Sequence, residues 1–554
     1  MAKEGHKYIF VLGGVMSGVG KGVVTSSVGL LLEQRGYSVN LVKVDPYLNV
    51  DAGTMNPTEH GETFVLRSGL ETDQDMGNYE RFLGRDLTNA DYMTSGMVYR
   101  SVIERERALE YNGKCVEAIP HVRDEILHRI RAAATQSGSR ISVIEIGGTI
   151  GDFQNELFIE AARVLKMNQP EDVLFVIVSY LPTPGTLGEM KTKPTQTAVR
   201  DLNSYGVQPD FIVARSKEPI DEKRKEKLAI WCNVRKDRII AAPDIKSIYD
   251  APLNFEKDKL SNALIGALKL SEKRKSGLTA WKKFAGAVTN TKAPEVRIAI
   301  VGKYFDTGDF VLSDAYLSVI EAIKFSAAKL GVQPKIIWVN SKNIEKGGAR
   351  AAALLADYDG IIVPGGFGES GIEGKIRAIQ FAREHHIPYF GLCYGMQLMV
   401  IEYARNVLKL KDAHTTEIKK DASDPVVDVM LEQKKHLIDS TYGGTMRLGA
   451  YPCYLKKGTI ARAAYKKELI EERHRHRYEI NPVYVKRLEA AGLVFSGTSP
   501  DGVLMEITEL PRTVHPFMLG TQFHPELQAR PLSPHPLFTE FLTAAISQKK
   551  KRAS

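Results

Sequence analysis

Apolar runs without polar alternation recur along the first half of the chain, and they constrain the fold more than any other feature. The runs are SVNLVKVD (38–45), SVIEIGG (142–148), VLFVIVSY (173–180) and FIVARS (211–216), and helical patterns separate them. A strand with one solvated face alternates apolar and polar residues, whereas a strand of a parallel sheet is buried on both faces. The sequence therefore predicts an α/β fold with a parallel sheet covered by helices on both sides.

A second series of the same kind occupies the other half of the chain. It comprises VRIAIVGKY (296–304), PKIIWVN (334–340), YDGIIVPGG (358–366) and IPYFGLC (387–393). A single core stops growing near about 250–300 residues, so a chain of 554 residues should form more than one domain. The segment 271–295 is charged and rich in small residues, as linkers are. We expect two α/β domains, 1–270 and 296–545, joined by this linker.

Composition restricts the partners of this chain. It has 75 basic and 66 acidic residues, and KKKR at 549–552 supplies four of the nine excess positive charges. No aromatic-basic recognition module accompanies them, so we expect no nucleic-acid partner and a solvated, disordered basic tail at 546–554. The sequence has neither an apolar stretch of about 18 residues nor a signal peptide, so we expect a cytoplasmic protein with no membrane partner. The four cysteines are too dispersed for a zinc site or a disulfide framework.

The opening stretch YIFVLGGVMSGVGKG (8–22) has the outline of a phosphate-binding loop. An apolar strand runs into glycines and Lys21, and a helical pattern follows. In the common loop, G-x-x-x-x-G-K-[ST], the hydroxyl after the lysine holds Mg²⁺. Here Gly22 follows Lys21, and Val15 stands where the first glycine should fall. We expect the loop to bind phosphate through Lys21 and backbone amides, so a metal must be held by other residues.

The second half contains a nucleophile on a sharp turn. In Gly391-Leu392-Cys393-Tyr394-Gly395, a strand pattern ends at the cysteine and a helical pattern, MQLMVIEYAR, begins after it. This is the strand–nucleophile–helix arrangement of the G-x-S-x-G elbow. Glycines permit the turn, and the helix N-terminus favours the thiolate. A buried structural cysteine is the alternative, but it would not need glycines on both sides.

A thiolate nucleophile needs a base and a group that orients the base. His524-Pro525-Glu526 follows a strand pattern and can present an imidazole and a carboxylate from one short loop. Upstream, the glycine-rich end of another strand, Val363 to Gly368, offers backbone N–H groups that can stabilise an oxyanion.

These three pieces in this order resemble the class I glutamine amidotransferase family. The resemblance implies that glutamine is hydrolysed through a thioester at Cys393, with His524 as the base and Glu526 as its partner. Backbone amides of Gly366 and Tyr394 would form the oxyanion hole. The residues implied to bind glutamine are Gly366, Tyr394, Gly395, Met396, Gln397, Glu417 and Arg477.

The first half carries KVDPYLNVDAGTMNPTEHGETFV (43–65), ETDQDMGNYERF (71–82), EIGGTIGD (145–152) and KTKPTQ (191–196). With ERHRHRYEIN (472–481), these stretches resemble the CTP synthase family over almost the whole chain. That family implies a Rossmann-like P-loop synthetase domain and a flavodoxin-like glutaminase domain. It also implies a ligase of pyrimidine biosynthesis: UTP, ATP, glutamine and water give CTP, ADP, phosphate and glutamate.

The resemblance also assigns nucleotide and metal sites. Those for ATP are Gly18, Val19, Gly20, Lys21, Gly22, Val23, Lys43, Asp75, Asp244 and Ile245. Those for UTP or CTP are Ser17, Asp152, Gln154, Lys191, Thr192, Lys193, Pro194, Thr195, Gln196 and Lys227. Asp75 and Glu145 would bind Mg²⁺ as oxygen ligands. CTP as feedback inhibitor, GTP as allosteric activator and a homotetramer are implied as well.

Simpler interpretations exist for single residues. Lys43 and Lys227 taken alone would be surface lysines, and Asp75 lies in an acidic cluster typical of a solvated turn. Glu145 carries more weight, because it interrupts an apolar strand where an unpaired carboxylate is costly to bury. A metal or another cation must compensate its charge.

Two segments depart from the family pattern. The usual Gly-Asp-Ile-Glu becomes Gly151-Asp152-Phe153-Gln154 here, so we hypothesise altered inhibition by CTP. The stretch 303–319 has extra residues, and those near 305–312 are candidates for the glutamine entrance or the GTP site.

Two other functions stay open. One is another P-loop amidoligase with a glutaminase domain, against which the KTKPTQ and HGETFV segments argue. The other is a catalytically retired, filament-forming homologue, against which the intact Cys393, His524 and Glu526 argue.

Overall fold

A computed structural model describes residues 5–14, 16–185, 188–275, 277–302, 306–307, 310–311, 316–366, 368–430, 433 and 444–553. Val15 of the opening loop and four of the eight residues 305–312 lie outside this set. Contacts divide the chain into two compact units. The first comprises Met1–Asp51 and Asn78–Thr289, and the second comprises Ala52–Gly77 and Asn290–Ser554. The predicted division at 271–295 would keep 52–77 in the first domain, and the domain limits stay a prediction.

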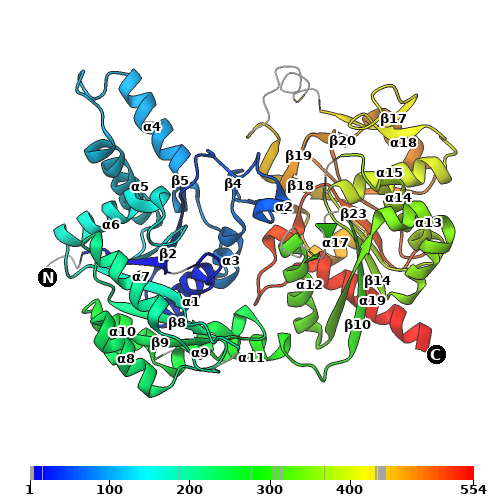
Figure 1. The fold of residues 1–554 in the computed structure, drawn as a ribbon. Coiled ribbons are helices and arrows are strands. Elements are labelled where there is room, and N and C mark those ends of the chain that lie inside the picture. The colour runs from blue at the N-terminus through cyan, green and yellow to red at the C-terminus, as the bar shows by residue number, and fades with distance from the viewer. Residues whose placement is uncertain are drawn as a thin grey trace. The chain divides into compact units, whose positions relative to one another are not determined.

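The first unit is built on a seven-stranded sheet in which every neighbouring pair is parallel, in the order β5-β2-β6-β1-β7-β8-β9 (Figure 1). The strands are β1 (Lys7–Gly14), β2 (Val39–Asp45), β5 (Tyr92–Thr94), β6 (Ile141–Ile146), β7 (Val173–Tyr180), β8 (Phe211–Ser216) and β9 (Ile239–Pro243). The four apolar runs of the first half are thus strands, and the parallel α/β fold is confirmed.

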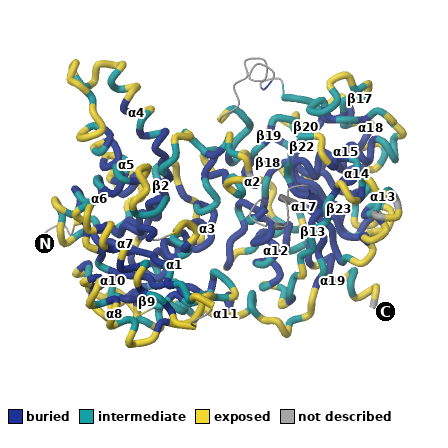
Figure 2. The backbone as a smooth tube through the Cα atoms, viewed as in Figure 1, coloured by how far each residue is buried: buried dark blue, intermediate teal, exposed yellow. Residues whose placement is uncertain are grey.

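Helices cover both faces of this sheet, which explains the lack of polar alternation. The helices of this unit are α1 (Lys21–Gln34), α4 (Ser95–Arg107), α5 (Arg123–Ser137), α6 (Glu156–Asn168), α7 (Lys193–Ser204), α8 (Glu222–Cys232), α9 (Ala251–Lys257), α10 (Leu260–Ala267) and α11 (Thr279–Val288), with residues 78–83 of α3 (Gln74–Leu83), whose first four residues group with the second unit. Phe10 and Phe158 belong to one core cluster, and Ile212 and Leu228 belong to another. Figure 2 shows the strands buried between these layers.

The segment predicted as a linker contains an ordered helix, α11. Its Trp281 is 3% exposed and donates from Nε1 to the Tyr249 carbonyl oxygen at 2.9 Å. The Phe284 ring packs edge-on against Tyr249, with the ring centroids 5.1 Å apart. Burying such a side chain stabilises a fold by roughly 1.5–3 kcal/mol. Helix α11 is therefore part of the first unit, and the change of unit follows at Thr289.

The second unit has a nine-stranded mixed sheet in the order β13-β10-β14-β15-β23-β22-β21-β18-β19. Its strands are β10 (Glu295–Gly302), β13 (Gln333–Asn340), β14 (Gly360–Val363), β15 (Tyr389–Leu392), β18 (Arg447–Leu455), β19 (Leu469–His476), β21 (Val494–Thr498), β22 (Met505–Glu509) and β23 (Met518–Thr521). The five strands from β13 to β23 are parallel, and the remaining pairs are antiparallel. The second series of apolar runs supplies four of the parallel strands.

Smaller elements complete this unit. Its other strands are β3 (Phe64–Val65), β4 (Glu71–Thr72), β11 (Asp306–Thr307), β12 (Phe310–Val311), β16 (Ala413–Thr415), β17 (Asp424–Val429) and β20 (Tyr478–Ile480). Its helices are α2 (Pro57–His60), α12 (Leu317–Leu330), α13 (Ser341–Ala353), α14 (Ile372–Glu384), α15 (Tyr394–Asn406), α17 (Ile460–Tyr465), α18 (Pro482–Ala490) and α19 (Pro536–Ala553).

The prediction of a disordered basic tail is wrong, because α19 continues through it to Ala553. Arg552 forms an ion pair with the buried Asp359 at 2.8 Å and donates to the carbonyl oxygen of Ala356 at 2.7 Å. Lys549 donates to the carbonyl oxygen of Glu295. The basic side chains that suggested disorder therefore bind the last turns of α19 to Asp359, Ala356 and Glu295 of the same unit.

The segment Ala52–Gly77 joins the second unit through close contacts with β18 and β19. Arg473 donates to the carbonyl oxygen of Val65 at 3.0 Å, and Arg475 donates to Glu71 at 2.8 Å. Gly449 has a φ of 91°, and a Cβ there would lie 2.6 Å from the backbone nitrogen of Gly69. The two backbones can pack this closely only because position 449 has no side chain.

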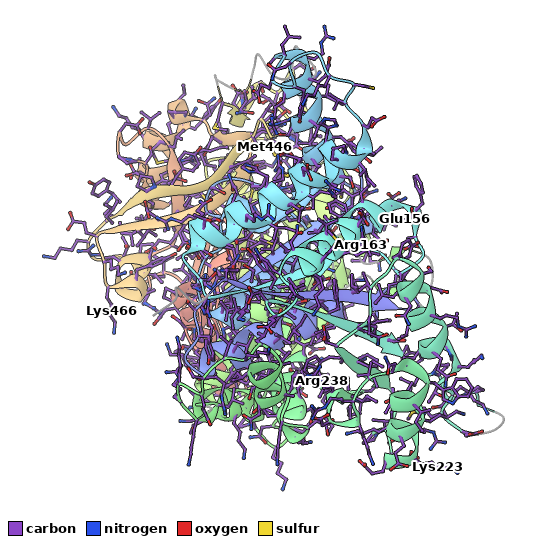
Figure 3. The ribbon with its side chains drawn as sticks, turned by 90° about the vertical axis from the view of Figure 1, so that its left-hand side faces the viewer. Glu156, Arg163, Lys223, Arg238, Met446 and Lys466 are labelled. Atoms are coloured by element: carbon purple, nitrogen blue, oxygen red, sulfur yellow. The ribbon has the colours of Figure 1, made fainter. Side chains whose placement is uncertain are left out.

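The surface is mixed in charge, as the composition indicates. Figure 3 labels charged side chains of both signs, among them Glu156 at the start of α6 and the exposed Lys223 on α8. Among the described helices, we find none with the length and apolar character that a membrane crossing requires.

Candidate active site

Cys393 lies on a sharp turn between β15 and α15. Its φ of 49° and ψ of −99° place a non-glycine residue in the left-handed region, which strains the backbone. A Cβ on Gly391 would lie 2.7 Å from the backbone carbon of Gly395, and a Cβ on Gly395 would lie 2.1 Å from the Val363 oxygen. The two glycines are therefore required for the turn that presents Cys393 at the start of a helix.

His524 and Glu526 follow β23, the neighbour of β15 in the sheet. The Nδ1 atom of His524 is 2.7 Å from Oε1 of Glu526, so the carboxylate orients the ring. Burial lowers the pKa of His524, but the Glu526 carboxylate and the Cys393 side chain raise it more, to about 10. The imidazole is thus protonated at neutral pH. A protonated imidazole beside a sulfur is the arrangement that favours a thiolate nucleophile.

The glycine-rich end of β14 lies against this pair. A Cβ on Gly365 would be 3.0 Å from Cε1 of His524 and 3.7 Å from Cβ of Cys393. In the same loop, the backbone nitrogen of Gly368 donates to the Glu417 carboxylate at 2.8 Å. The structure thus brings the loop that contains Gly366 beside the cysteine and histidine, while Phe367 lies outside the described residues.

The other residues predicted to bind glutamine lie on α15 and after β19. Tyr394, Gly395 and Met396 form the first turn of α15. Gln397, in the next position, is 3% exposed and donates to the Tyr478 carbonyl oxygen at 2.9 Å. Arg477 donates to the side chain of Gln433 at 2.8 Å. Glutamine binding by these residues stays a prediction.

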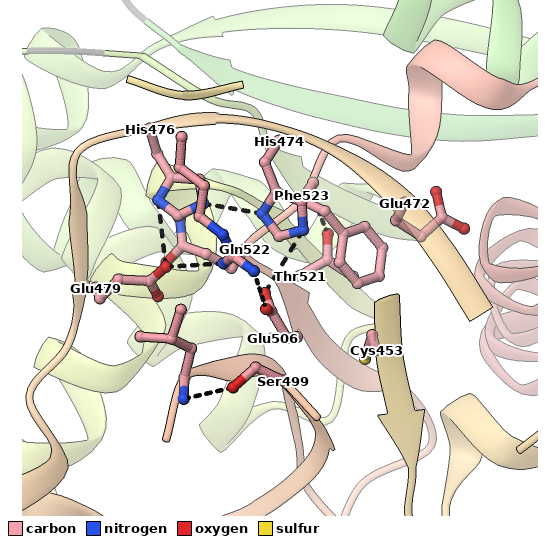
Figure 4. A network of polar contacts seen from close by, with 12 residues as sticks. Cys453, Glu472, His474, His476, Glu479, Ser499, Glu506, Thr521, Gln522 and Phe523 are labelled. Carbon is pink, nitrogen blue, oxygen red and sulfur yellow. Dashed lines mark hydrogen bonds and ion pairs between the residues drawn. The ribbon is translucent and has the colours of Figure 1, made fainter. Parts of the chain in front are cut away.

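A buried network of charged and ring side chains lies beside the His524 loop (Figure 4). His474 Nδ1 and His476 Nε2 are 2.9 Å apart, and Arg447 forms ion pairs with Glu479 at 3.1 Å and Glu506 at 2.7 Å. Burial holds the pKa of both histidines well below its ordinary value and raises the pKa of both glutamates. The network anchors β19, whose other contacts reach the active site.

Two backbone oxygens of β19 touch the catalytic pair. His524 donates its backbone N–H to the Arg473 oxygen at 2.7 Å, and Cys393 Sγ is 3.9 Å from the Arg475 oxygen. The side chains of the same two arginines hold the segment Ala52–Gly77. One strand therefore contacts both that segment and the catalytic residues.

In the first unit, the predicted phosphate loop leads into α1. Gly18 and Gly20 have φ values of 70° and 87°, and Lys21 donates from Nζ to the Gly148 oxygen at 2.7 Å. A helix N-terminus with such a glycine loop presents unhindered backbone N–H groups to an anion. The site has both the positive charge and the backbone donors that phosphate binding needs.

A cavity of about 450 Å³ adjoins this loop. Its lining includes Gly20 and Val23 from the loop and first helical turn, with Asp244 and Ile245 after β9. The sequence predicts ATP binding by all four residues, although the two pairs are more than two hundred positions apart in the chain. The structure gathers them around one space, and their contact with ATP stays a prediction.

The charge of Glu145 is compensated, as its place in an apolar strand requires. Glu145 is 1% exposed, its Oε1 is 3.1 Å from Nζ of Lys43, and the Tyr79 hydroxyl donates to its Oε2. The cation at this position is therefore Lys43. Asp75, the other predicted metal ligand, groups with the second unit. Within the described part of the chain, no group of three or more His, Cys, Asp or Glu residues forms a metal site.

The residues predicted for UTP or CTP lie in several loops and helices of the first unit, with Lys227 on α8. Asp152 accepts from the backbone N–H and the hydroxyl of Thr149 at 2.7 and 2.6 Å, which lowers the pKa of Asp152. Ser17, Gln154 and Lys227 are exposed.

The predicted segment Lys191–Gln196 leads into α7. Thr195 is fully buried, with its hydroxyl 2.9 Å from that of Ser179, and Gln196 donates to Thr192 at 3.1 Å. These two bonds fix the first turn of the helix. The nucleotide contacts of all these residues stay predictions.

Comparison with known proteins decides the family. The family model for the CTP synthase N-terminus matches residues 7–270, and that for class-I glutamine amidotransferase matches 311–544. CTP synthase from Pyrococcus furiosus is 49% identical over 551 residues, covering 99% of both chains. The chain belongs to the CTP synthase family. CTP synthase from Sulfolobus acidocaldarius is 48% identical over 541 residues, covering 97% of this chain and 99% of its own.

A solved structure is also similar to the second half of this CTP synthase family member. It is the Trypanosoma brucei CTPS glutaminase domain with bound acivicin, with 37% identity and a TM-score of 0.42. The match covers 46% of this chain and 94% of that one.

The sequence assigns no role to two residues that the structure places at or near Cys393. Gln522 donates to Cys393 Sγ at 3.6 Å, and Glu71 holds Arg475. Gln522 carried a usable signal, because a polar residue in the apolar stretch before His524 needs a partner. Glu71 carried none, since its partner lies 404 positions away.

Proposed function

We propose that this protein is a glutamine-dependent ligase that aminates UTP to CTP with ATP. The observation that carries the proposal is the elbow of Cys393 with His524 and Glu526, in a chain about half identical to CTP synthases over its full length. UTP, ATP, glutamine and water give CTP, ADP, phosphate and glutamate.

In the glutaminase half, the Cys393 thiolate attacks the amide carbon of glutamine. Backbone N–H groups of Gly366 and Tyr394 stabilise the oxyanion that forms. Protonated His524 gives its proton to the leaving nitrogen, and ammonia departs from a thioester. His524 then takes a proton from water, which hydrolyses the thioester to glutamate and restores the thiolate. Glu526 keeps the ring oriented through both steps.

In the synthetase half, the uracil O4 attacks the γ-phosphorus of ATP, and ADP leaves. Ammonia then adds at C4 of the pyrimidine ring, and phosphate departs with the former O4. Phosphoryl transfer depends mainly on positioning and charge neutralisation, which Lys21 and the loop amides supply. The cavity beside Gly20 and Asp244 is the candidate adenine pocket.

Mg²⁺ is the metal that this chemistry implies, and it would neutralise phosphate charge. Carboxylate oxygens are its preferred protein ligands, so Asp75 and Glu145 fit by donor type. Nζ of Lys43 is 3.1 Å from Oε1 of Glu145, so Mg²⁺ binding at Glu145 would require this ion pair to loosen. Inhibition by CTP, altered at Gln154, activation by GTP, a homotetramer and a cytoplasmic location are further parts of this proposal, supported by the family resemblance.

Two assays on the purified protein test the proposal. The first supplies ATP, UTP and Mg²⁺ with ammonia or with glutamine, and it follows CTP by absorbance. We expect CTP from both nitrogen sources. The second repeats the assay with Cys393→Ala, which should lose glutamine-driven synthesis and keep ammonia-driven synthesis. Absence of CTP with ammonia, or loss of both activities in the variant, would contradict the proposal.

A further inference from the structure

Besides the His524 imidazole, whose pKa the Cys393 side chain helps to raise, two polar groups among the described residues contact the Cys393 sulfur, and they favour opposite protonation states. The Arg475 carbonyl oxygen, 3.9 Å away, can only accept, so it favours the thiol. The Gln522 side-chain nitrogen, 3.6 Å away, can only donate, so it favours the thiolate. Ionisation of Cys393 therefore weakens the first contact and strengthens the second.

The direction of the Gln522 amide is set by its neighbours. The Tyr478 carbonyl oxygen is an acceptor, so Gln397, 2.9 Å away, must turn its NH₂ group toward it. The same Gln397 nitrogen donates to Oε1 of Gln522 at 3.2 Å. With its oxygen engaged in this way, Gln522 must turn its NH₂ group to the sulfur.

The side chains that position Gln522 are buried. Gln522 is fully buried, and Gln397 is 3% exposed. The backbone nitrogen of Gln522 donates to the Glu506 oxygen at 2.8 Å, beside the network of Figure 4 in which Gln522 is labelled. A fixed donor in a low-dielectric site stabilises an anion more than a mobile or solvated one.

We propose that Gln522, oriented by Gln397, is a catalytic hydrogen-bond donor that stabilises the Cys393 thiolate. The inference rests on the proposed glutaminase function and adds a residue to its machinery. The Cys393 thiolate forms again each time the thioester is hydrolysed. The Gln522 amide therefore also stabilises the leaving sulfur in the second half of the cycle.

The test uses the pH dependence of alkylation. Gln522→Met keeps the length of the side chain and removes the donor. The full-length protein is treated with iodoacetamide between pH 5 and 10, and the modification of Cys393 is followed by mass spectrometry. A hydrogen bond to a charged group is worth about 1.5–3 kcal/mol, or about a 10- to 100-fold effect. We therefore expect the half-maximal pH of alkylation to rise by about one to two pH units.

Gln528→Met is the matched control, because Gln528 also donates its side-chain amide, but to the Glu471 backbone oxygen at 2.9 Å and to the Glu472 carboxylate. Its alkylation midpoint should equal that of the unsubstituted protein. Gln397→Met should raise the midpoint in the same direction as Gln522→Met. No glutamine is present during alkylation, so this shift is measured independently of substrate binding.

The kinetic result should agree. In Gln522→Met, kcat/KM for glutamine should fall about 10- to 100-fold, and CTP synthesis from ammonia should be unchanged. The inference is overturned if the half-maximal pH of alkylation is unchanged in Gln522→Met, or if it rises in Gln528→Met as much as in Gln522→Met. Absence of glutamine-driven synthesis in the unsubstituted protein would instead overturn the proposed function.

Discussion

Replacing Glu71 by glutamine tests how Ala52–Gly77 is held in the second unit. The side chain of Glu71 is 1% exposed, and its partner Arg475 is 15% exposed. Removing one member of a buried ion pair costs about 3–5 kcal/mol, and the partial exposure of Arg475 reduces this to about 2–3 kcal/mol. Each kcal/mol lowers the Tm of a unit of this size by about 2–4 °C. We expect the unfolding transition of the second unit to fall by about 5–10 °C.

The same strand provides a matched control. Arg67 and Glu471 also pair between this segment and β19, but both side chains are 47% exposed. An exposed pair contributes about 0–1 kcal/mol, so Glu471→Gln should lower the Tm by less than about 3 °C. The two substitutions remove the same charge between the same two segments and differ in burial.

Calorimetry measures both effects, and the synthesis assay measures their functional consequence. The Arg475 backbone oxygen lies near the Cys393 sulfur, so Glu71→Gln should reduce glutamine-driven synthesis more than ammonia-driven synthesis. Equal Tm losses in the two variants, or none in Glu71→Gln, would refute the argument from burial.

Three further predictions concern the active site and the last helix. Gly395→Ala adds a Cβ that would lie 2.1 Å from a backbone oxygen, so glutamine-driven CTP formation should fall at least about tenfold while ammonia-driven formation persists. Glu526→Gln removes a charge that raises the pKa of His524 to about 10, so the protonated ring is lost at lower pH. The alkaline limb of kcat/KM for glutamine should move down from near pH 10, and an unmoved limb would disprove this origin of the pKa. The raised pKa of His524 also contributes stability that is complete below about 6.5 and lost as pH rises through about 10, so the alkaline loss of Tm should be smaller in Glu526→Gln. Arg552→Ala breaks an ion pair between a partly exposed arginine and the buried Asp359 carboxylate. The free energy of unfolding, measured with denaturant, should fall by about 1 kcal/mol in this variant and by less than about 0.5 kcal/mol in Lys550→Ala.

Local patterns predicted the elements that depend on local physics. Unalternating apolar runs became parallel strands because both faces of each sheet are covered. The glycines around Cys393 identified the turn, since no other residue fits there. Glu145 was expected to need a compensating cation, and Lys43 supplies it at 3.1 Å.

Features set by distant partners could not be predicted in this way. The tail at 546–554 resembles a disordered end in composition, and only the buried Asp359 explains why Arg552 is ordered. Charged residues surround the apolar positions of α11 in the sequence, so the segment resembles a linker. Only the large apolar Trp281 indicates a buried face. No pattern within Ala52–Gly77 indicates that its partners lie on β18 and β19. The nucleotide contacts depend on ligands, which sequence patterns do not position.

The place of Ala52–Gly77 has a consequence for how the chain is made. Val65 and Arg473 bond across 408 positions of sequence. At about 5–20 residues per second, the ribosome delivers the second partner roughly 20–80 s after the first. Phe64, Val65 and Leu66, all fully buried in the finished protein, lack their contacts with β19 for that interval. The second unit therefore cannot be completed until synthesis is nearly finished, and we expect chaperones to bind this short apolar segment during translation.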